Sequence, residues 1–259
     1  ACDAVAAAAG RTAEVGPWRS GAFSCLATSG ALAGFLPAEQ GGTAAREPAL
    51  LVLLAAIAER CLTTALVLSQ WASACRIIAA GPPRVRDAML PRLARGETPT
   101  TVGISQLSTS RRHLGTPALA ATGAGDRWRL DGLCPWVTGA DSCDTIVTGA
   151  VAPGGEQRFF VVSTSAPGLE IAPPMTMLAL SGSRTSSVAF RGAEPLEVIV
   201  PAEGGVRTGG LATTALALGA TRASIGLVAD EARGRPALTP IADGLRDRNS
   251  TRLNSSHEW

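Results

Sequence analysis

The chain changes character near Thr98, where apolar residues at helical spacing give way to short alternating runs separated by turn residues. Ala, Leu, Val and Ile dominate before this point, and Thr, Val, Ser and Gly dominate after it. Helices repeat about every 3.6 residues and strands every second residue, so one kind of element cannot satisfy both patterns. The chain must therefore combine a helical part with a separate sheet.

The part after Thr98 is rich in short segments that predict strands. Gly, Pro and Ser punctuate them, as in Pro153-Gly154-Gly155. Many short strands at this spacing favour a β-barrel or sandwich. The expected strands are Thr101–Ile104, Ala118–Thr122, Asp126–Leu133, Thr145–Val151, Arg158–Ser163, Leu169–Ala172, Ser186–Arg191 and Glu197–Val200.

Helices are expected on both sides of these strands. Arg46–Ala80 predicts two helices broken near Glu59–Thr64, Arg84–Leu93 a short one, and Gly210–Ala232 a long Ala-rich one. The expected class is therefore α+β multidomain, with a middle β-barrel or sandwich. Its parts are an N-terminal helical domain (1–99), a middle β-domain (100–205), an incomplete C-terminal helical bundle (206–248) and a non-native tail (249–259).

Composition excludes several functional classes. The chain has 259 residues, of which 46% are hydrophobic and 17% are charged, so it can bury a sizeable core. Its net charge of +2 is too small to indicate a nucleic-acid partner. Only two histidines are present, so a metal site is not expected. The six cysteines form no CxxC pair, no signal peptide is recognisable, and apolar runs are interrupted by Glu, Arg or Gln. We expect a cytoplasmic protein with reduced thiols and no membrane span.

The segment Asp126–Val151 holds the most suggestive chemistry. Charged residues alternate with Trp128 and Leu130, as in a half-buried strand, and Pro135 should interrupt regular pairing. Between this strand and the next lies Trp136-Val137-Thr138. An aromatic plane and a hydroxyl held between strands can bind a flat ligand.

Several motifs in order resemble the flavin-dependent acyl-CoA dehydrogenase family over roughly residues 25–235. Each is a local match to a family pattern, such as Leu-Pro-x-Leu-Ala-x-Gly-Glu or Trp-Ile-Thr followed by Ala-Asp. The matching segments are Gly34–Gly42, Gly81–Glu97, Gly132–Ala150, Phe159–Pro167 and Val198–Gly204.

The resemblance implies a fold and an activity. It implies an FAD flavoprotein of fatty acid metabolism that oxidises an acyl-CoA or related thioester between Cα and Cβ. It also implies an electron-transfer acceptor and a homo-oligomer when full length. In the family the Trp-x-Thr element packs on the flavin ring, and its Thr donates a hydrogen bond near N5. An oriented donor there stabilises the charge that hydride transfer delivers.

Site residues follow from the matched positions. Trp136, Val137 and Thr138 take the places of the family's flavin face, although a buried Trp that fills a barrel end is the plain structural alternative. The resemblance also implies flavin contacts from the loop after the first strand. These contacts are Val102, Ile104, Ser105, Leu107 and Ser110.

That loop departs from the family's Thr-Glu-Pro-x-x-Gly-Ser pattern. The chain has Ser105–Arg111, in which Ser105 keeps a hydroxyl but the Glu, Pro and Gly-Ser are lost. Ser110 and Arg111 are the candidate substrate-binding residues, because hydroxyls and guanidinium groups suit phosphate oxygens. The alternative is that Arg111 and Arg112 are solvated residues on a loop without a ligand. The departure puts the substrate in question more than the cofactor.

The family's catalytic carboxylate lies further into the C-terminal bundle than this sequence reaches. Asp230 and Glu231 fall too early and are expected to be solvated helix charges. The sequence is therefore interpreted as a fragment without a catalytic residue, inactive alone. Two alternatives remain: a flavin-dependent monooxygenase or oxidase of the same fold, and a catalytically silent binding homologue.

Overall fold

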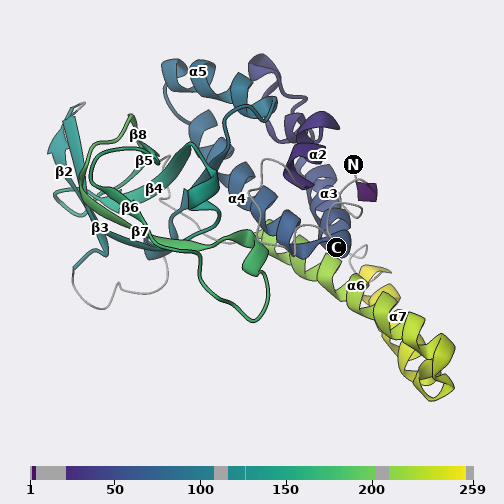
Figure 1. Ribbon diagram of the computed structural model, residues 1–259. Coiled ribbons are helices and arrows are strands. Elements are labelled where there is room, and N and C mark those ends of the chain that lie inside the picture. The colour runs from purple at the N-terminus through teal and green to yellow at the C-terminus, as the bar shows by residue number, and fades with distance from the viewer. Residues whose placement is uncertain (1, 4–21, 108–115, 126, 202–209, 255–259) are drawn as a thin grey trace.

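A computed structural model describes residues 2–3, 22–107, 116–125, 127–201 and 210–254. Helices lie beside a curved sheet, and the second-last helix starts against the N-terminal helices and runs outward together with the last one (Figure 1). The N-terminal part contains helices α2 (Ala22–Thr28), α3 (Glu47–Arg60), α4 (Leu62–Ala79) and α5 (Pro83–Ala94). The predicted break between the two long helices is confirmed at Cys61, whose backbone is extended (φ −157°, ψ 101°).

The turn before α3 explains the paired glycines of the first motif. The Gly42 N–H donates to the Pro37 carbonyl at 2.9 Å, which closes the turn. A Cβ on Gly42 would lie 2.0 Å from the Leu36 carbonyl oxygen, and Gly41 adopts φ +84°. A side chain at either position would therefore clash or strain the backbone.

The strands form one hydrogen-bonded sheet of eight. They are β1 (Thr100–Gly103), β2 (Leu119–Ala124), β3 (Arg127–Val137), β4 (Thr145–Val151), β5 (Gln157–Ser163), β6 (Leu169–Ile171), β7 (Ser186–Ala193) and β8 (Glu197–Ile199). Their order is β6-β7-β3-β2-β4-β5-β8, with β1 paired to β4. The β1–β4 and β2–β4 pairs are parallel, and the other pairs are antiparallel.

Two hydrophobic cores lie on opposite faces of β5. Phe159 and Val161 join the helical core around Trp71, whereas Phe160 and Val162 join a second core. Successive side chains of a strand point to opposite faces, so β5 separates the two cores. The second core also includes side chains of β2, β3, β4 and β7, so the sheet curls around it. This arrangement matches the expected helical and β parts.

The C-terminal part consists of α6 (Leu211–Gly234) and α7 (Thr239–Asn254). The sequence predicted α6 but no helix over 239–254, and α7 extends into the proposed non-native tail. Both α4 and α6 are long and apolar enough to cross a membrane by length and composition. In α4, half of the apolar stretch is buried inside the fold. In the apolar stretch of α6, the buried share is 11%. Burial identifies α4 as a core helix and leaves α6 largely uncovered.

Candidate functional site

Trp136 lies at the end of β3 with its side chain turned outward. Its side chain is 53% exposed, whereas Cys134 and Val137 on either side of it are fully buried. The pairing of β3 with β7 shifts register between Cys134 and Val137. This confirms the irregularity predicted at Pro135, although β3 continues to Val137. Such a bulge re-aims a side chain, and here an indole ring is presented at the surface.

Thr138 follows directly and is held from two sides. Its backbone carbonyl accepts a hydrogen bond from Thr101 Oγ1 on β1 at 2.8 Å. Its hydroxyl lies 3.2 Å from Thr185 Oγ1, just before β7. The next residue, Gly139, adopts φ +62° and donates its N–H to the Arg184 carbonyl at 3.1 Å. Elements distant in sequence therefore fix the position of Thr138.

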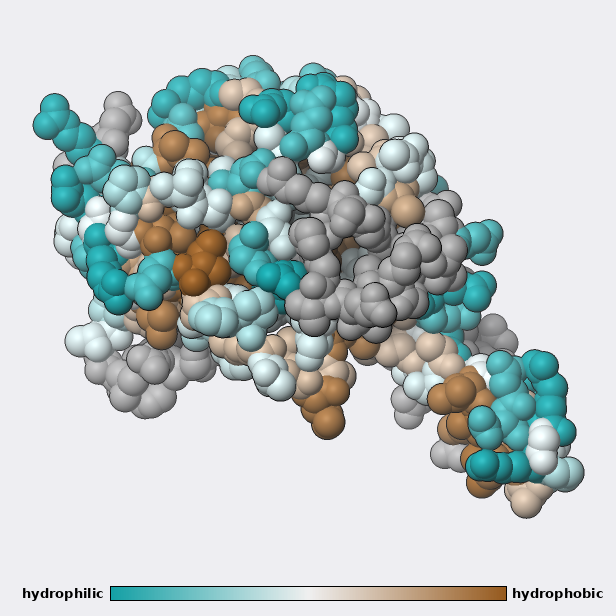
Figure 2. All heavy atoms as spheres, viewed as in Figure 1, coloured by the Kyte–Doolittle hydropathy of each residue, from teal (hydrophilic) through white to brown (hydrophobic). Residues whose placement is uncertain are grey.

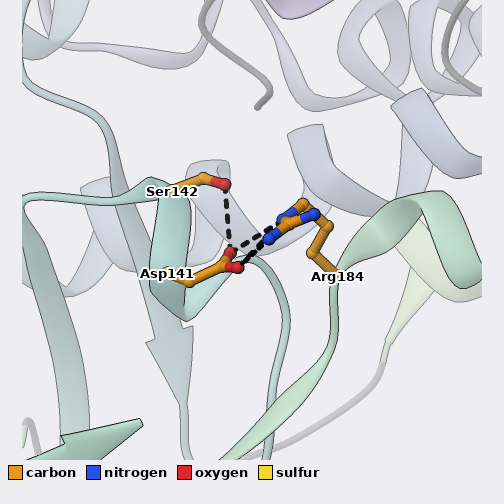
Figure 3. A network of polar contacts seen from close by, with 3 residues as sticks. All are labelled: Asp141, Ser142 and Arg184. Atoms are coloured by element: carbon orange, nitrogen blue, oxygen red, sulfur yellow. Dashed lines mark hydrogen bonds and ion pairs between the residues drawn. The ribbon is translucent and has the colours of Figure 1, made fainter. Parts of the chain in front are cut away.

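An ion pair joins the turn after Thr138 to the loop before β7 (Figure 3). Arg184 Nε lies 3.0 Å from Asp141 Oδ1 and 2.9 Å from Oδ2, and Arg184 Nη2 also contacts Oδ2. Ser142 Oγ donates to Asp141 Oδ1 at 3.1 Å. The hydrogen bond to Asp141 raises the pKa of Arg184, so the guanidinium stays charged. Arg184 itself has φ +50°, a strained value for a residue with a side chain.

The loop after β1 contributes a buried amide. Gln106 Nε2 donates to the Gly149 carbonyl at 2.8 Å and also contacts Gly103 O and Thr148 Oγ1, both at 3.2 Å. Its Oε1 accepts from Cys134 Sγ at 3.1 Å. Burial raises the pKa of the Cys134 thiol to about 12. Gln106 thereby ties the loop to β3 and β4, close to the strand that carries Trp136.

The predicted site residues fall into three groups. Trp136 is exposed and Thr138 lies at the surface end of a buried hydroxyl cluster. Val102, Leu107 and Val137 are buried, and Ile104 and Ser105 are partly buried. Ser110 and Arg111 lie outside the described residues.

Sequence reasoning missed Asp141, Ser183, Arg184 and Thr185. They come together only through the pairing of β3 with β7, and the pattern Ser-Arg-Thr-Ser at 183–186 was the one local sign of a polar turn. Asp230 and Glu231 were correctly expected to be solvated. Their side chains are 65% and 52% exposed, and they pair with Arg233 and Arg235 on the same helix.

The comparisons with known proteins bear on the family and the fold of the chain. No protein-family model matches the chain. The cyclohex-1-ene-1-carbonyl-CoA dehydrogenase of Geobacter metallireducens (strain ATCC 53774 / DSM 7210 / GS-15) is 30% identical over 189 residues, which are 69% of this chain and 49% of the relative. The chain thus spans about half the length of the curated relative that it matches.

Solved structures share the fold. A structure described as an FAD-dependent dehydrogenase has a TM-score of 0.76 at 20% identity, covering 98% of this chain and 75% of the other. The dibenzothiophene monooxygenase of Paenibacillus sp. A11-2 has a TM-score of 0.70 at 17% identity, covering 90% of this chain and 63% of the other. Together with the sequence similarity to the Geobacter enzyme, this fold shows that the chain belongs to the acyl-CoA dehydrogenase family, whose members are flavoprotein oxidoreductases.

Proposed function

We propose that this chain binds FAD and that Trp136, Val137 and Thr138 form the face on which the flavin ring lies. The observation that carries the proposal is an exposed Trp two residues before a Thr whose hydroxyl buried groups hold in place. An exposed Trp offers a large, rigid apolar plane, and Trp is enriched at interfaces where one end of the ring is apolar and the other is wet. The residues present therefore fit a flat aromatic ring with a polar edge.

Each residue has a distinct role in this proposal. Trp136 covers one face of the ring and excludes water from it. Thr138 donates a hydrogen bond to the ring edge, and the contact of its hydroxyl with Thr185 Oγ1 at 3.2 Å holds that hydroxyl in place. Bound FAD supplies a two-electron acceptor. A donor that is already oriented stabilises the resulting charge without reorganisation of solvent.

The proposed reaction is α,β-dehydrogenation of an acyl-CoA or related thioester. The Geobacter relative supports it, because its name specifies a CoA thioester and a dehydrogenase. With this reaction we propose an electron-transfer acceptor and a cytoplasmic homo-oligomer active in fatty acid metabolism. Ser110 and Arg111 stay candidate substrate contacts, which the described residues do not cover.

A second candidate is an oxygen-using flavoenzyme of the same fold. The departure of Ser105–Arg111 from the family pattern motivates it, and the monooxygenase with a TM-score of 0.70 shows that one fold serves both kinds of enzyme. A third candidate is a homologue that only binds or assembles. It would hold no flavin at all.

Anaerobic flavin reduction separates the three candidates. We expect the protein encoded by the complete reading frame to be yellow and to lose flavin absorbance on addition of butyryl-CoA, octanoyl-CoA or cyclohex-1-ene-1-carbonyl-CoA. A yellow protein that no thioester bleaches, but that consumes oxygen once its flavin is reduced, supports the second candidate. A colourless protein that does not take up added FAD overturns the flavin proposal.

The 259-residue chain by itself is expected to retain FAD weakly and to show no dehydrogenase turnover. Neither Asp230 nor Glu231 can serve as the base, because both are exposed and paired on the projecting helix. An assay that couples thioester oxidation to dye reduction tests this expectation. Robust dye reduction by the chain would refute it.

A further inference from the structure

The hydroxyl groups behind Trp136 form a short row. Ser183 Oγ lies 2.8 Å from Thr185 Oγ1, which lies 3.2 Å from Thr138 Oγ1. Ser183 is 0% exposed, Thr185 6% and Thr138 8%. In each contact either oxygen can be the donor. Which hydroxyl donates in each contact must therefore be decided from the energetics of the hydrogen bonds.

Counting protons limits the choices. Each hydroxyl carries one proton, so the two contacts of the row use two of its three protons and leave one to spare. If Thr138 donates to Thr185 and Thr185 to Ser183 (the inward direction), the spare proton is on Ser183. If both neighbours donate to Thr185, it is on Thr185. If Ser183 donates to Thr185 and Thr185 to Thr138 (the outward direction), it is on Thr138. An unsatisfied buried donor costs about 1–3 kcal/mol.

The outward direction places the spare proton where a partner can reach it. Among the described residues, the Ser183 hydroxyl has no other hydrogen bond than the one to Thr185, and Thr185 Oγ1 none beyond Ser183 and Thr138. Thr138 instead lies two residues after Trp136, which is exposed, and at 8% it is the most exposed of the three hydroxyl residues. A proton on Thr138 can therefore be donated to a ligand on that surface, whereas one on Ser183 would be stranded in the core.

We propose that Ser183 and Thr185 are positioning residues whose hydroxyls donate in the order Ser183 to Thr185 to Thr138, so that the Thr138 proton is aimed at the bound flavin. The inference rests on the proposed FAD site. Hydrogen bonds in a row polarise one another, so the relay also strengthens the final donor. The Asp141–Arg184 ion pair and the Gly139–Arg184 backbone bond hold the residue before Thr185 in place.

The test compares variants that differ by one hydroxyl, in the protein encoded by the complete reading frame. Thr185→Val removes the central hydroxyl and keeps the shape, and Thr185→Ser keeps the hydroxyl. Ser183→Ala removes the inner one, and Thr138→Val removes the donor itself. The measured quantity is the ratio of affinities for reduced and oxidised FAD, obtained from the midpoint potential in equilibrium with a redox dye.

We expect Thr138→Val and Thr185→Val each to lower this ratio roughly two- to tenfold, with Ser183→Ala weaker and Thr185→Ser close to the unsubstituted protein. The double variant Thr138→Val/Thr185→Val should match Thr138→Val alone, because both act through one proton. Far-ultraviolet circular dichroism checks the fold, and Ser183→Ala carries the test if Thr185→Val does not fold.

The outcomes separate the relay from the flavin site. If Thr138→Val changes the ratio while Thr185→Val and Ser183→Ala do not, or if Thr185→Ser behaves like Thr185→Val, the relay is wrong and the flavin site stands. If Thr138→Val leaves the ratio unchanged, Thr138 is not the donor and the relay is wrong. If the unsubstituted protein binds no FAD, the proposed flavin face itself fails.

Discussion

At the residue scale, the Asp141–Arg184 pair should stabilise the fold more than ion pairs that lie in water. Its side chains are 20% and 23% exposed, so solvent screens the pair only in part. We expect Asp141→Asn to lower the free energy of unfolding by about 1–2 kcal/mol in urea titrations. Glu170→Gln is the matched control, because its pair with Arg191 is 62% and 74% exposed and should contribute under about 0.5 kcal/mol. Equal effects would contradict this account.

Buried thiols give a second prediction at this scale. Burial raises the pKa of Cys75 well above its ordinary value and that of Cys134 to about 12. Both thiols should therefore react with iodoacetamide at pH 8 at least about tenfold more slowly than the half-buried Cys25, as followed by mass spectrometry of the native protein. Rapid labelling of Cys134 while the fold is intact would show that its surroundings are open.

The raised pKa of Cys134 also predicts how the free energy of unfolding depends on pH. An unfolded thiol titrates near pH 8.5, so between that pH and about 12 the folded protein binds more protons at Cys134 than the unfolded chain does. The stability that this thiol contributes is full below about pH 8.5 and is lost as the pH rises toward about 12. Cys134→Ala should accordingly flatten the fall in stability over this range in urea titrations at several pH values.

At the scale of elements, α6 packs closely against α3 at Gly219. A Cβ on Gly219 would lie 2.3 Å from the Ala55 carbonyl oxygen and 2.5 Å from Ala58 Cβ. Gly219→Ala must push the helices apart and should cost about 1–3 kcal/mol of unfolding free energy. Gly226→Ala lies on the same helix with nothing within 4 Å, so it should stabilise by about 0.5–1 kcal/mol through helix propensity. Thermal unfolding of both variants measures the contrast, and a shift in the same direction would refute the packing.

The elements also show how far the sequence predicts this fold. Period-two alternation located the strands well, and β4 spans the predicted Thr145–Val151. Alternation says nothing of partners, so the parallel pairing of Thr100 with Thr145 had to come from the structure. The helix α7 was missed because Gly234 and Pro236 mark the end of α6 and the segment that follows is mostly polar, with only a short apolar row at Leu238, Ile241 and Leu245.

Some residues of the candidate site could be predicted from the sequence, and others could not. Trp136 and Thr138 could be proposed as site residues from the sequence, because one short motif carries both. Ser183, Thr185 and Arg184 were not, since their roles depend on contacts across the sheet. Thr185 is 47 positions from Thr138, and Arg184 is 43 from Asp141. Long-range polar contacts of this kind leave no periodic trace in a sequence.

At the scale of the whole molecule, α6 and α7 form a projecting arm (Figure 1). Hydrophobic side chains appear among hydrophilic ones along this arm (Figure 2), and Leu211, Leu227 and Ile241 are exposed. Uncovered apolar surface on a helix pair promotes association. The chain should therefore self-associate as its concentration rises, and Leu227→Glu should weaken the association. Analytical ultracentrifugation decides, and a monodisperse monomer at high concentration would count against the prediction.

The central claim is that Trp136 and Thr138 form the flavin face, and a titration with FAD tests it most directly. Flavin fluorescence is followed as each protein is added, with Leu196→Ala, an exposed apolar truncation elsewhere, as the control. We predict that Trp136→Ala weakens FAD binding roughly tenfold or more and Thr138→Val roughly two- to tenfold, while the control binds like the unsubstituted protein. FAD binding that neither substitution at the site weakens would contradict the account.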